Sequence, residues 1–147
     1  MTDDPFELRR FVEAQQGVYE TALAEIRGGR KETHWMWFVF PQLAGLGTSP
    51  ISRRYAIRSA AEASAYLEHP VLGRRLRECA AAMNALPTSS AADVLGDVDA
   101  IKLRSSLTLF AHVPGAPAVF TEGLDKFFDG APDPRTLQLL AGSPPSR

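Results

Sequence analysis

Short segments of helical periodicity, separated by prolines and glycines, fill most of this chain and limit its fold more than any other feature. Between the breaks, apolar residues recur three and four positions apart, as they do on the buried face of a helix. The strict alternation of apolar and polar residues that marks a half-buried strand is scarce. The sequence therefore predicts an all-α fold, a compact single-domain bundle of about six to eight helices.

Helix-starting residues define where these helices begin. Asp4 and Pro5 provide a capping carboxylate followed by a proline at the first helical position. Ser59 and Glu62 form a capping box, and Asp133 caps the last segment. The predicted helices span about residues 5–27, 59–69, 70–86, 97–113, 117–128 and 134–140.

Two neighbouring stretches do not follow this pattern. Residues 33–43 are aromatic and β-branched, which favours a strand, but they lack the polar alternation of a half-exposed one. A buried helix that ends at Pro41 fits them equally well. Residues 44–51 contain two glycines and a proline, which predicts a loop.

The length and the hydrophobic fraction of the chain indicate one domain. The chain has 147 residues and is 45% hydrophobic, enough for one continuous core, which we expect over about residues 5–141. Residues 142–147 are expected to form a flexible tail.

The net charge is −1, with 16 basic and 17 acidic residues, so binding to nucleic-acid phosphates is disfavoured. Nothing in the sequence sets an oligomeric state.

Other features of the sequence limit the location, the metal sites and the cofactors that we expect for this protein. The N-terminus lacks the basic and apolar regions of a signal peptide, and no apolar run is long enough to span a membrane, so we expect a cytoplasmic protein. The single cysteine, Cys79, excludes an internal disulfide and is predicted to pack inertly on the inner face of a helix. The histidines lack zinc spacing, and the usual nucleotide-cofactor motifs are missing, so we expect no metal and no cofactor.

The aromatic segment is the strongest candidate for function. Both tryptophans, Trp35 and Trp37, lie between Glu32 and His34 on one side and Gln42 on the other. Flat rings beside hydrogen-bond donors and an imidazole suit a nucleobase or another planar ligand. The alternative is that the rings simply form the core.

A glycine-containing loop follows the aromatic segment. It reads GLGTS at residues 45–49 and leads to Arg53 and Arg54. Free backbone N–H groups, hydroxyls and arginines could hold an anion such as phosphate. The alternative is an ordinary connecting loop.

A third group of polar residues lies on the predicted helix 97–113. Asp99 and Lys102 are neighbours at i, i+3, and Ser105 and Ser106 follow one turn later. Lysine and hydroxyls on an otherwise apolar helix could bind phosphate or ribose. The alternative is a surface ion pair, with small residues that allow close helix packing.

Several uncommon sequence motifs occur in order along the chain. They include THWMWFVFPQL at 33–43, GLGTS at 45–49 and KLRSSLTLF at 102–110. In these motifs the chain resembles the bacterial domain-of-unknown-function family numbered 1810, over about residues 6–140. The resemblance implies a compact all-helical domain, with a departure at Leu95, where the family usually has an aromatic residue. The name calpastatin, sometimes attached to this family, belongs to a disordered inhibitor and does not suit a globular composition.

A more remote resemblance suggests an activity. The segments around Thr33-His34-Trp35, Ile57 and Glu62-Ala63 are similar to motifs of the NAD/ADP-ribose-associated (NADAR) superfamily. Members of that superfamily bind nucleotides of the ADP-ribose or riboflavin-pathway type, or cleave N-glycosidic bonds in them. Their hallmark is Glu-His, whereas here Thr33 stands in place of the glutamate, with Glu32 one residue early. This difference weakens what the resemblance implies about catalysis more than what it implies about ligand binding.

The leading hypothesis is a site for a nucleotide or ADP-ribose-like small molecule, with N-glycosidic cleavage as a possible activity. Trp35 or Trp37 would stack on the base, His34 would donate a proton, and Glu32 or Asp99 would stabilise an oxocarbenium-like state. The other proposed ligand-binding residues are Gln42, Arg53, Arg54, Lys102, Ser105 and Ser106. The alternative is a non-catalytic protein-interaction or regulatory module, in which His34 and Lys102 would lie on opposite faces.

Overall fold

The computed structural model describes residues 4–142, and within them the chain forms ten helices and no extended strand, as the all-α prediction requires. The helices are α1 (Arg9–Gln15), α2 (Tyr19–Arg27), α3 (Met36–Val39), α4 (Pro50–Arg54), α5 (Ala60–Glu68), α6 (Leu72–Asn84), α7 (Ala91–Leu95), α8 (Asp97–Ala111), α9 (Val119–Phe128) and α10 (Pro134–Gly142). The count exceeds the expected six to eight because one predicted helix is divided and three helices have only four or five residues.

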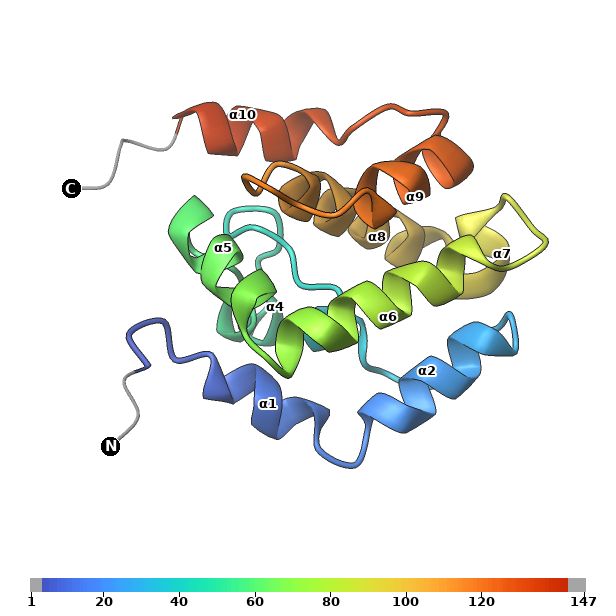
Figure 1. Ribbon diagram of the computed structural model, residues 1–147, viewed down its shortest axis with the longest axis horizontal. Coiled ribbons are helices and arrows are strands. Elements are labelled where there is room, and N and C mark those ends of the chain that lie inside the picture. Colours follow the sequence, from blue (N-terminus) through green and yellow to red (C-terminus); the bar gives the residue numbers. More distant parts are fainter. Residues whose placement is uncertain (1–3, 143–147) are drawn as a thin grey trace.

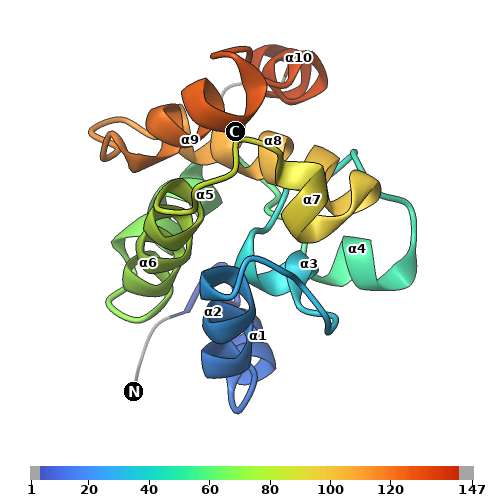
Figure 2. The ribbon, with the colours of Figure 1, turned by 90° about the vertical axis from the view of Figure 1, so that its right-hand side faces the viewer.

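Helix α8 is the central element of the fold (Figures 1 and 2). It packs against α5, α7, α9 and α10. Helix α6 crosses the molecule in Figure 1 and contacts α2, α5 and α9. Helices α1 and α2 lie below α6 in Figure 1, and α10 covers the opposite side. The short helices α3 and α4 lie on the side of α8 that faces α7 (Figure 2).

The predicted helix 5–27 is wrong in two places. It is divided at Gly17, whose φ of +73° belongs to the left-handed region that interrupts a helix and favours glycine. It also begins at Arg9 instead of Pro5. The carboxylate of Asp4 still acts near this helix start, because it accepts hydrogen bonds from the backbone N–H groups of Leu8 and Arg9.

Three other predicted helix starts are present. The Ser59 hydroxyl accepts from the backbone N–H of Glu62, and Asp133 accepts from that of Thr136. Helix α6 begins at Leu72, two residues after Pro70. Its predicted inner face is buried except for Val71, which is half-buried and precedes the helix. Burial raises the pKa of the Cys79 thiol to about 12, which keeps the thiol protonated.

Short helices account for the remaining differences. Residues 33–43 contain α3, which ends before Pro41, so the helical alternative describes part of this segment. The predicted loop 44–51 ends early, because Ser49 caps α4 at Pro50. Helix α7 was not predicted, although Ser90 caps it in the same way. At the other end, Gly142 belongs to α10, and the rest of the predicted tail lies outside the described residues.

Helices α5 and α6 approach each other closely at Gly73. A Cβ atom at this position would lie 1.9 Å from the backbone carbonyl oxygen of Leu67. A backbone oxygen cannot move aside as a flexible side chain can, so the contact requires glycine.

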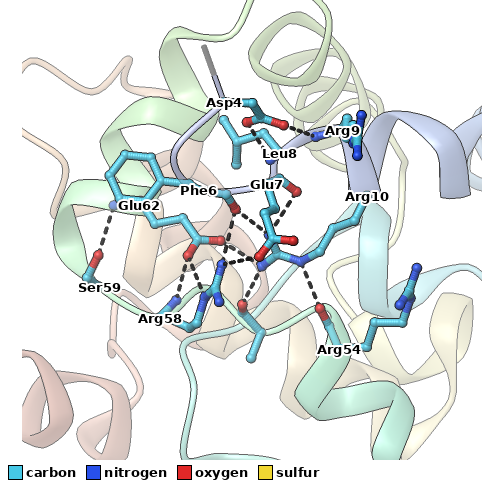
Figure 3. A network of polar contacts seen from close by, with 11 residues as sticks. Asp4, Phe6, Glu7, Leu8, Arg9, Arg10, Arg54, Arg58, Ser59 and Glu62 are labelled. Carbon is cyan, nitrogen blue, oxygen red and sulfur yellow. Dashed lines mark hydrogen bonds and ion pairs between the residues drawn. The ribbon is translucent and has the colours of Figure 1, made fainter.

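A buried carboxylate connects three segments on one side of the fold (Figure 3). Glu62 of α5 has no exposed surface and pairs with Arg10 of α1 at 2.7 Å. It also accepts from the backbone N–H of Arg58 at 3.2 Å. Arg10 in turn donates to the carbonyl oxygens of Arg54 and Ala56. The pair therefore holds α1 and the segment between α4 and α5 against α5.

We expect Gly73→Ala to lower the free energy of unfolding by about 3 kcal/mol, because the helices must separate to admit the methyl group. Urea denaturation would measure this. Gly142→Ala is the matched control, since a Cβ at Gly142 meets no atom within 4 Å. Equal stability of Gly73→Ala and the wild type would contradict the close approach.

We expect Glu62→Gln to destabilise the protein by about 3 kcal/mol, because Arg10 would keep a largely buried charge without its partner. Glu68→Gln, an exposed change on the same helix, should alter stability by less than about 0.5 kcal/mol. Similar unfolding free energies for the two variants would rule out a central role for the pair.

Candidate functional site

A small pocket opens between α3, α4, α8 and the loop that precedes α4. Its volume is about 100 Å³. The side chains and backbone that line it come from Met36, Trp37, Phe40, Gln42, Leu43, Ala44, Gly45, Gly47, Ser52, Arg53, Tyr55, Ala56, Arg58 and Lys102. We call it the Trp37–Lys102 pocket. Its residues come from segments far apart in sequence, and they include four of the predicted ligand-binding residues.

Backbone pairing forms one wall of the pocket. Leu43 and Ile57 make a parallel bridge, in which the Ile57 N–H donates to Gln42 at 2.8 Å and the Ala44 N–H donates to Ile57 at 2.7 Å. The glycine loop then passes close to α4: a Cβ at Gly47 would lie 2.6 Å from the Ser52 Cβ. The loop therefore depends on glycine at this position to bring its backbone against Ser52.

Asp99 lies between two lysines beside the pocket. Its carboxylate oxygens are 3.0 Å from the Lys31 Nζ and 3.3 Å from the Lys102 Nζ. Each ammonium also lies over a tryptophan ring, Lys31 at 5.4 Å from Trp35 and Lys102 at 4.7 Å from Trp37. All three charged side chains are at most 20% exposed, so these interactions are only partly screened by water. The predicted aromatic and lysine segments thus meet.

Trp35 and Trp37 have different environments. Trp35 has no exposed surface, and its Nε1–H donates to Glu25 at 2.8 Å. A ring enclosed in this way cannot stack on a ligand, so among the two alternatives only Trp37 can take that role in this conformation. Trp37 is partly exposed and lines the pocket.

The predicted proton donor and carboxylates lie outside the pocket lining. His34 is exposed, with its ring centroid 6.4 Å from that of Trp37. Glu32 is exposed and contributes its backbone N–H to Glu25. Asp99 reaches the pocket only through Lys102. His34 and Asp99 are therefore near the pocket, whereas the Glu32 side chain has no described contact with it.

The two predicted serines are buried in α8 and do not line the pocket. The Ser105 hydroxyl lies 3.2 Å from both the Ile101 carbonyl oxygen and the Asp133 carboxylate, on the side of α8 toward α10. The Ser106 hydroxyl is buried and has no hydrogen-bond partner among the described residues. These positions place neither hydroxyl in the pocket lining, so this pocket gives no support to the phosphate or ribose contact predicted for them.

Only one of the two predicted arginines lines the pocket. Arg53 lines the pocket, and its guanidinium has no hydrogen bond or ion pair to another of the residues 4–142. Arg54 does not line it, and its Nε lies 3.3 Å from the Tyr55 hydroxyl. Gln42 lines the pocket as predicted. Arg58 and Tyr55 line it as well, although only their nearness to the arginine pair in sequence could have suggested them.

Glu25 is a residue that the sequence pattern did not identify. Its carboxylate accepts from the backbone N–H groups of Glu32 and Thr33, from the Thr33 hydroxyl and from Trp35 Nε1. Burial favours the neutral carboxyl, but these four hydrogen bonds outweigh it and lower the pKa of Glu25 to about 2. Glu25 therefore fixes the segment that carries His34 and leads to Trp37.

Residues 4–142 contain no group of three or more histidine, cysteine, aspartate or glutamate side chains that could hold a metal ion. None of the helices in this range has the length and apolar character needed to cross a membrane.

Comparisons with known proteins agree with this fold. The model of a family described as "Protein of unknown function (DUF1810)" matches residues 5–140. The crystal structure of the conserved hypothetical protein Rv1873 from Mycobacterium tuberculosis is similar, with 50% sequence identity and a TM-score of 0.93. The match covers 95% of this chain and 100% of that one. No curated protein matches the sequence.

The low pKa of Glu25 predicts a pH-dependent contribution to stability. A carboxyl with a pKa of 4.5 when unfolded and about 2 when folded stabilises the fold above pH 4.5, and this stabilisation is lost as the pH falls toward 2. Glu25→Gln should therefore be less stable than the wild type at neutral pH, with a difference that shrinks below pH 4.5. Urea denaturation followed by tryptophan fluorescence would measure it, with the exposed Glu20→Gln as control. A difference independent of pH would contradict the assignment.

Proposed function

The chain belongs to the family described as "Protein of unknown function (DUF1810)", and within its all-helical fold we propose that the Trp37–Lys102 pocket binds a phosphorylated, nucleotide-like small molecule. One observation carries this proposal. Three residues with cationic side chains, Arg53, Arg58 and Lys102, contribute to the pocket lining, and no aspartate or glutamate does.

Such a lining favours an anion. Arg58 already pairs with Glu62 at 3.3 Å, and Lys102 pairs with Asp99. Arg53 has no such partner among residues 4–142, so its charge is available to a ligand. Arginine and lysine both form charge-assisted hydrogen bonds to phosphate oxygens, and the Ser52 hydroxyl and Gln42 amide add further polar contacts.

The size of the pocket sets which part of a nucleotide would enter. Ligand sites for drug-sized molecules usually measure at least about 300 Å³. The Trp37–Lys102 pocket has about 100 Å³, so it suits one phosphate group. The base would remain at the surface, where the partly exposed ring of Trp37 and the nearby imidazole of His34 offer flat contacts.

Cleavage of an N-glycosidic bond is the finer part of the proposal and depends on Asp99. The reaction needs a carboxylate to stabilise an oxocarbenium-like state, an acid to protonate the leaving base and a water molecule that bonds to the anomeric carbon as the base departs. A phosphate that binds Lys102 would compete with Asp99 for the ammonium and free one carboxylate oxygen. Asp99 and His34 would then supply the two groups.

The alternative, a non-catalytic interaction module, has less support. It expects His34 and Lys102 on opposite faces of the fold. Both lie beside the same Trp37 ring, His34 at 6.4 Å between ring centroids and Lys102 at 4.7 Å from Nζ to the ring. This shared position favours one ligand site.

Calorimetric titration with AMP and ADP-ribose would test the binding. We expect Arg53→Gln and Lys102→Gln each to weaken binding about tenfold or more, because each removes a charge-assisted hydrogen bond. Arg53→Gln is the cleaner variant, since it breaks no described ion pair. Arg27→Gln, an exposed change at the end of α2, is the matched control and should bind as the wild type does.

Two results would decide against the proposal. Absence of binding by the wild type would remove it, and so would equal loss of affinity in Arg27→Gln and Arg53→Gln, since that pattern indicates non-specific attraction. For cleavage, release of free base by the wild type but not by Asp99→Asn is expected. Binding without base release would leave a binding protein and end the catalytic part.

A further inference from the structure

A second hollow lies where the end of α1, the start of α2 and the first half of α6 meet (Figure 1). Its volume is about 530 Å³, which is within the range of small-molecule sites. The polar side chains that line it include those of Gln15, Tyr19, Glu20, Arg74, Arg75 and Glu78. We call it the Arg75 hollow. It shares no lining residue with the Trp37–Lys102 pocket, so it is a separate candidate site.

Arg75 is a partly buried cation without an acidic partner. Its Nη1 donates to the Gln15 amide oxygen at 3.1 Å, and its guanidinium carbon lies 4.8 Å from the centroid of the Tyr19 ring. Its Nε is buried and has no hydrogen-bond partner among residues 4–142. No acidic side chain in that range forms an ion pair with it. Since a buried charge is stabilised by a nearby opposite charge, the protein alone leaves this guanidinium incompletely matched.

The only carboxylate on α6, that of Glu78, is held by other groups. It follows Arg75 by one helical turn, a spacing at which opposite charges can pair. Instead, Glu78 accepts from the Tyr19 hydroxyl and lies 3.8 Å from the Arg74 guanidinium. Burial raises the pKa of Tyr19, so this hydroxyl remains a donor. Arg75 is therefore left for an anion from outside the chain.

The charges of the lining select the kind of anion. Two arginines line the hollow, but so do Glu20 and Glu78. These carboxylates would repel a multiply charged phosphate more strongly than a single carboxylate. A carboxylate also matches the planar guanidinium with two parallel hydrogen bonds. Glu20 forms no ion pair among residues 4–142, so it is available to a positive group on the same ligand.

We infer that the Arg75 hollow binds a small zwitterion of the amino-acid class, with its carboxylate on Arg75 and its ammonium group toward Glu20 and Glu78. The side chain of Leu23 also lines the hollow, which favours an amino acid with an apolar side chain. This site goes beyond the proposed function, because it uses neither the Trp37–Lys102 pocket nor a phosphorylated ligand.

Blocked amino acids provide the test on the wild-type protein. L-leucine has both charges, N-acetyl-L-leucine lacks the ammonium group, and L-leucinamide lacks the carboxylate. We expect L-leucine to bind at least about tenfold more tightly than either blocked form, because each of them loses one charge-assisted contact. NMR titration would measure the affinities from the shifts of backbone amide resonances at residues 15–20 and 74–78.

Matched variants locate the binding. Arg75→Gln should weaken L-leucine binding about tenfold or more, and Arg75→Lys should restore part of it because the charge remains. Arg77→Gln, an exposed change on the same helix that does not line the hollow, is the control and should bind as the wild type does. Circular dichroism would check the fold of each variant. The comparison of L-leucine with its blocked forms does not depend on any variant.

Three results would overturn the inference. They are absence of L-leucine-dependent shifts at these residues, equal affinity for L-leucine and its blocked forms, and tighter binding of inorganic phosphate than of L-leucine at the same residues. Arg53→Gln should leave L-leucine binding unchanged, whereas it should weaken AMP binding. Failure of the zwitterion site would therefore leave the proposed function standing, and loss of AMP binding would leave this site standing.

Discussion

The buried carboxylate of Glu62 is the interaction on which the rest of this structure depends. A charge without exposed surface is tolerated only with a close partner and several hydrogen bonds, and Arg10 and the Arg58 backbone supply them. These contacts hold the segment between α4 and α5. Because Ala56 and Arg58 of that segment line the pocket, and Ile57 pairs with Leu43, the position of the pocket wall follows from the Arg10–Glu62 pair.

A second carboxylate fixes the opposite side of the site in a different way. Glu25 accepts hydrogen bonds mainly from the segment that follows α2, and these bonds set where Trp35 enters the core. Trp37, two residues later in α3, then faces the pocket and Lys102. The acidic groups near the site are thus held in structural contacts, whereas Arg53 and Lys102 are among the residues that line the pocket. The proposed anion site would therefore lie in a chain whose net charge is slightly negative.

Local signals in the sequence account for most of the helices but for only part of the site. Capping by Ser59 and Asp133 acts over three residues, so it is readable from sequence. The break at Gly17 was missed because a single glycine inside a periodic segment is also compatible with a continuous helix. The role of Glu25 depends on a loop that folds back seven to ten residues later, which periodicity does not describe. Likewise, only tertiary packing distinguishes buried Trp35 from accessible Trp37.

The proposed binding and the proposed cleavage would make opposite demands on Asp99, so binding would have to come first. While Lys31 and Lys102 both hold its carboxylate, its negative charge is neutralised and cannot stabilise a developing cation. Only a ligand with its own negative charge can draw Lys102 away, since a neutral ligand offers the ammonium no better partner. A phosphate in the pocket would therefore be the condition for chemistry as well as the basis of affinity. It follows that a neutral nucleoside, which has the same glycosidic bond but no phosphate, should neither bind tightly nor activate Asp99.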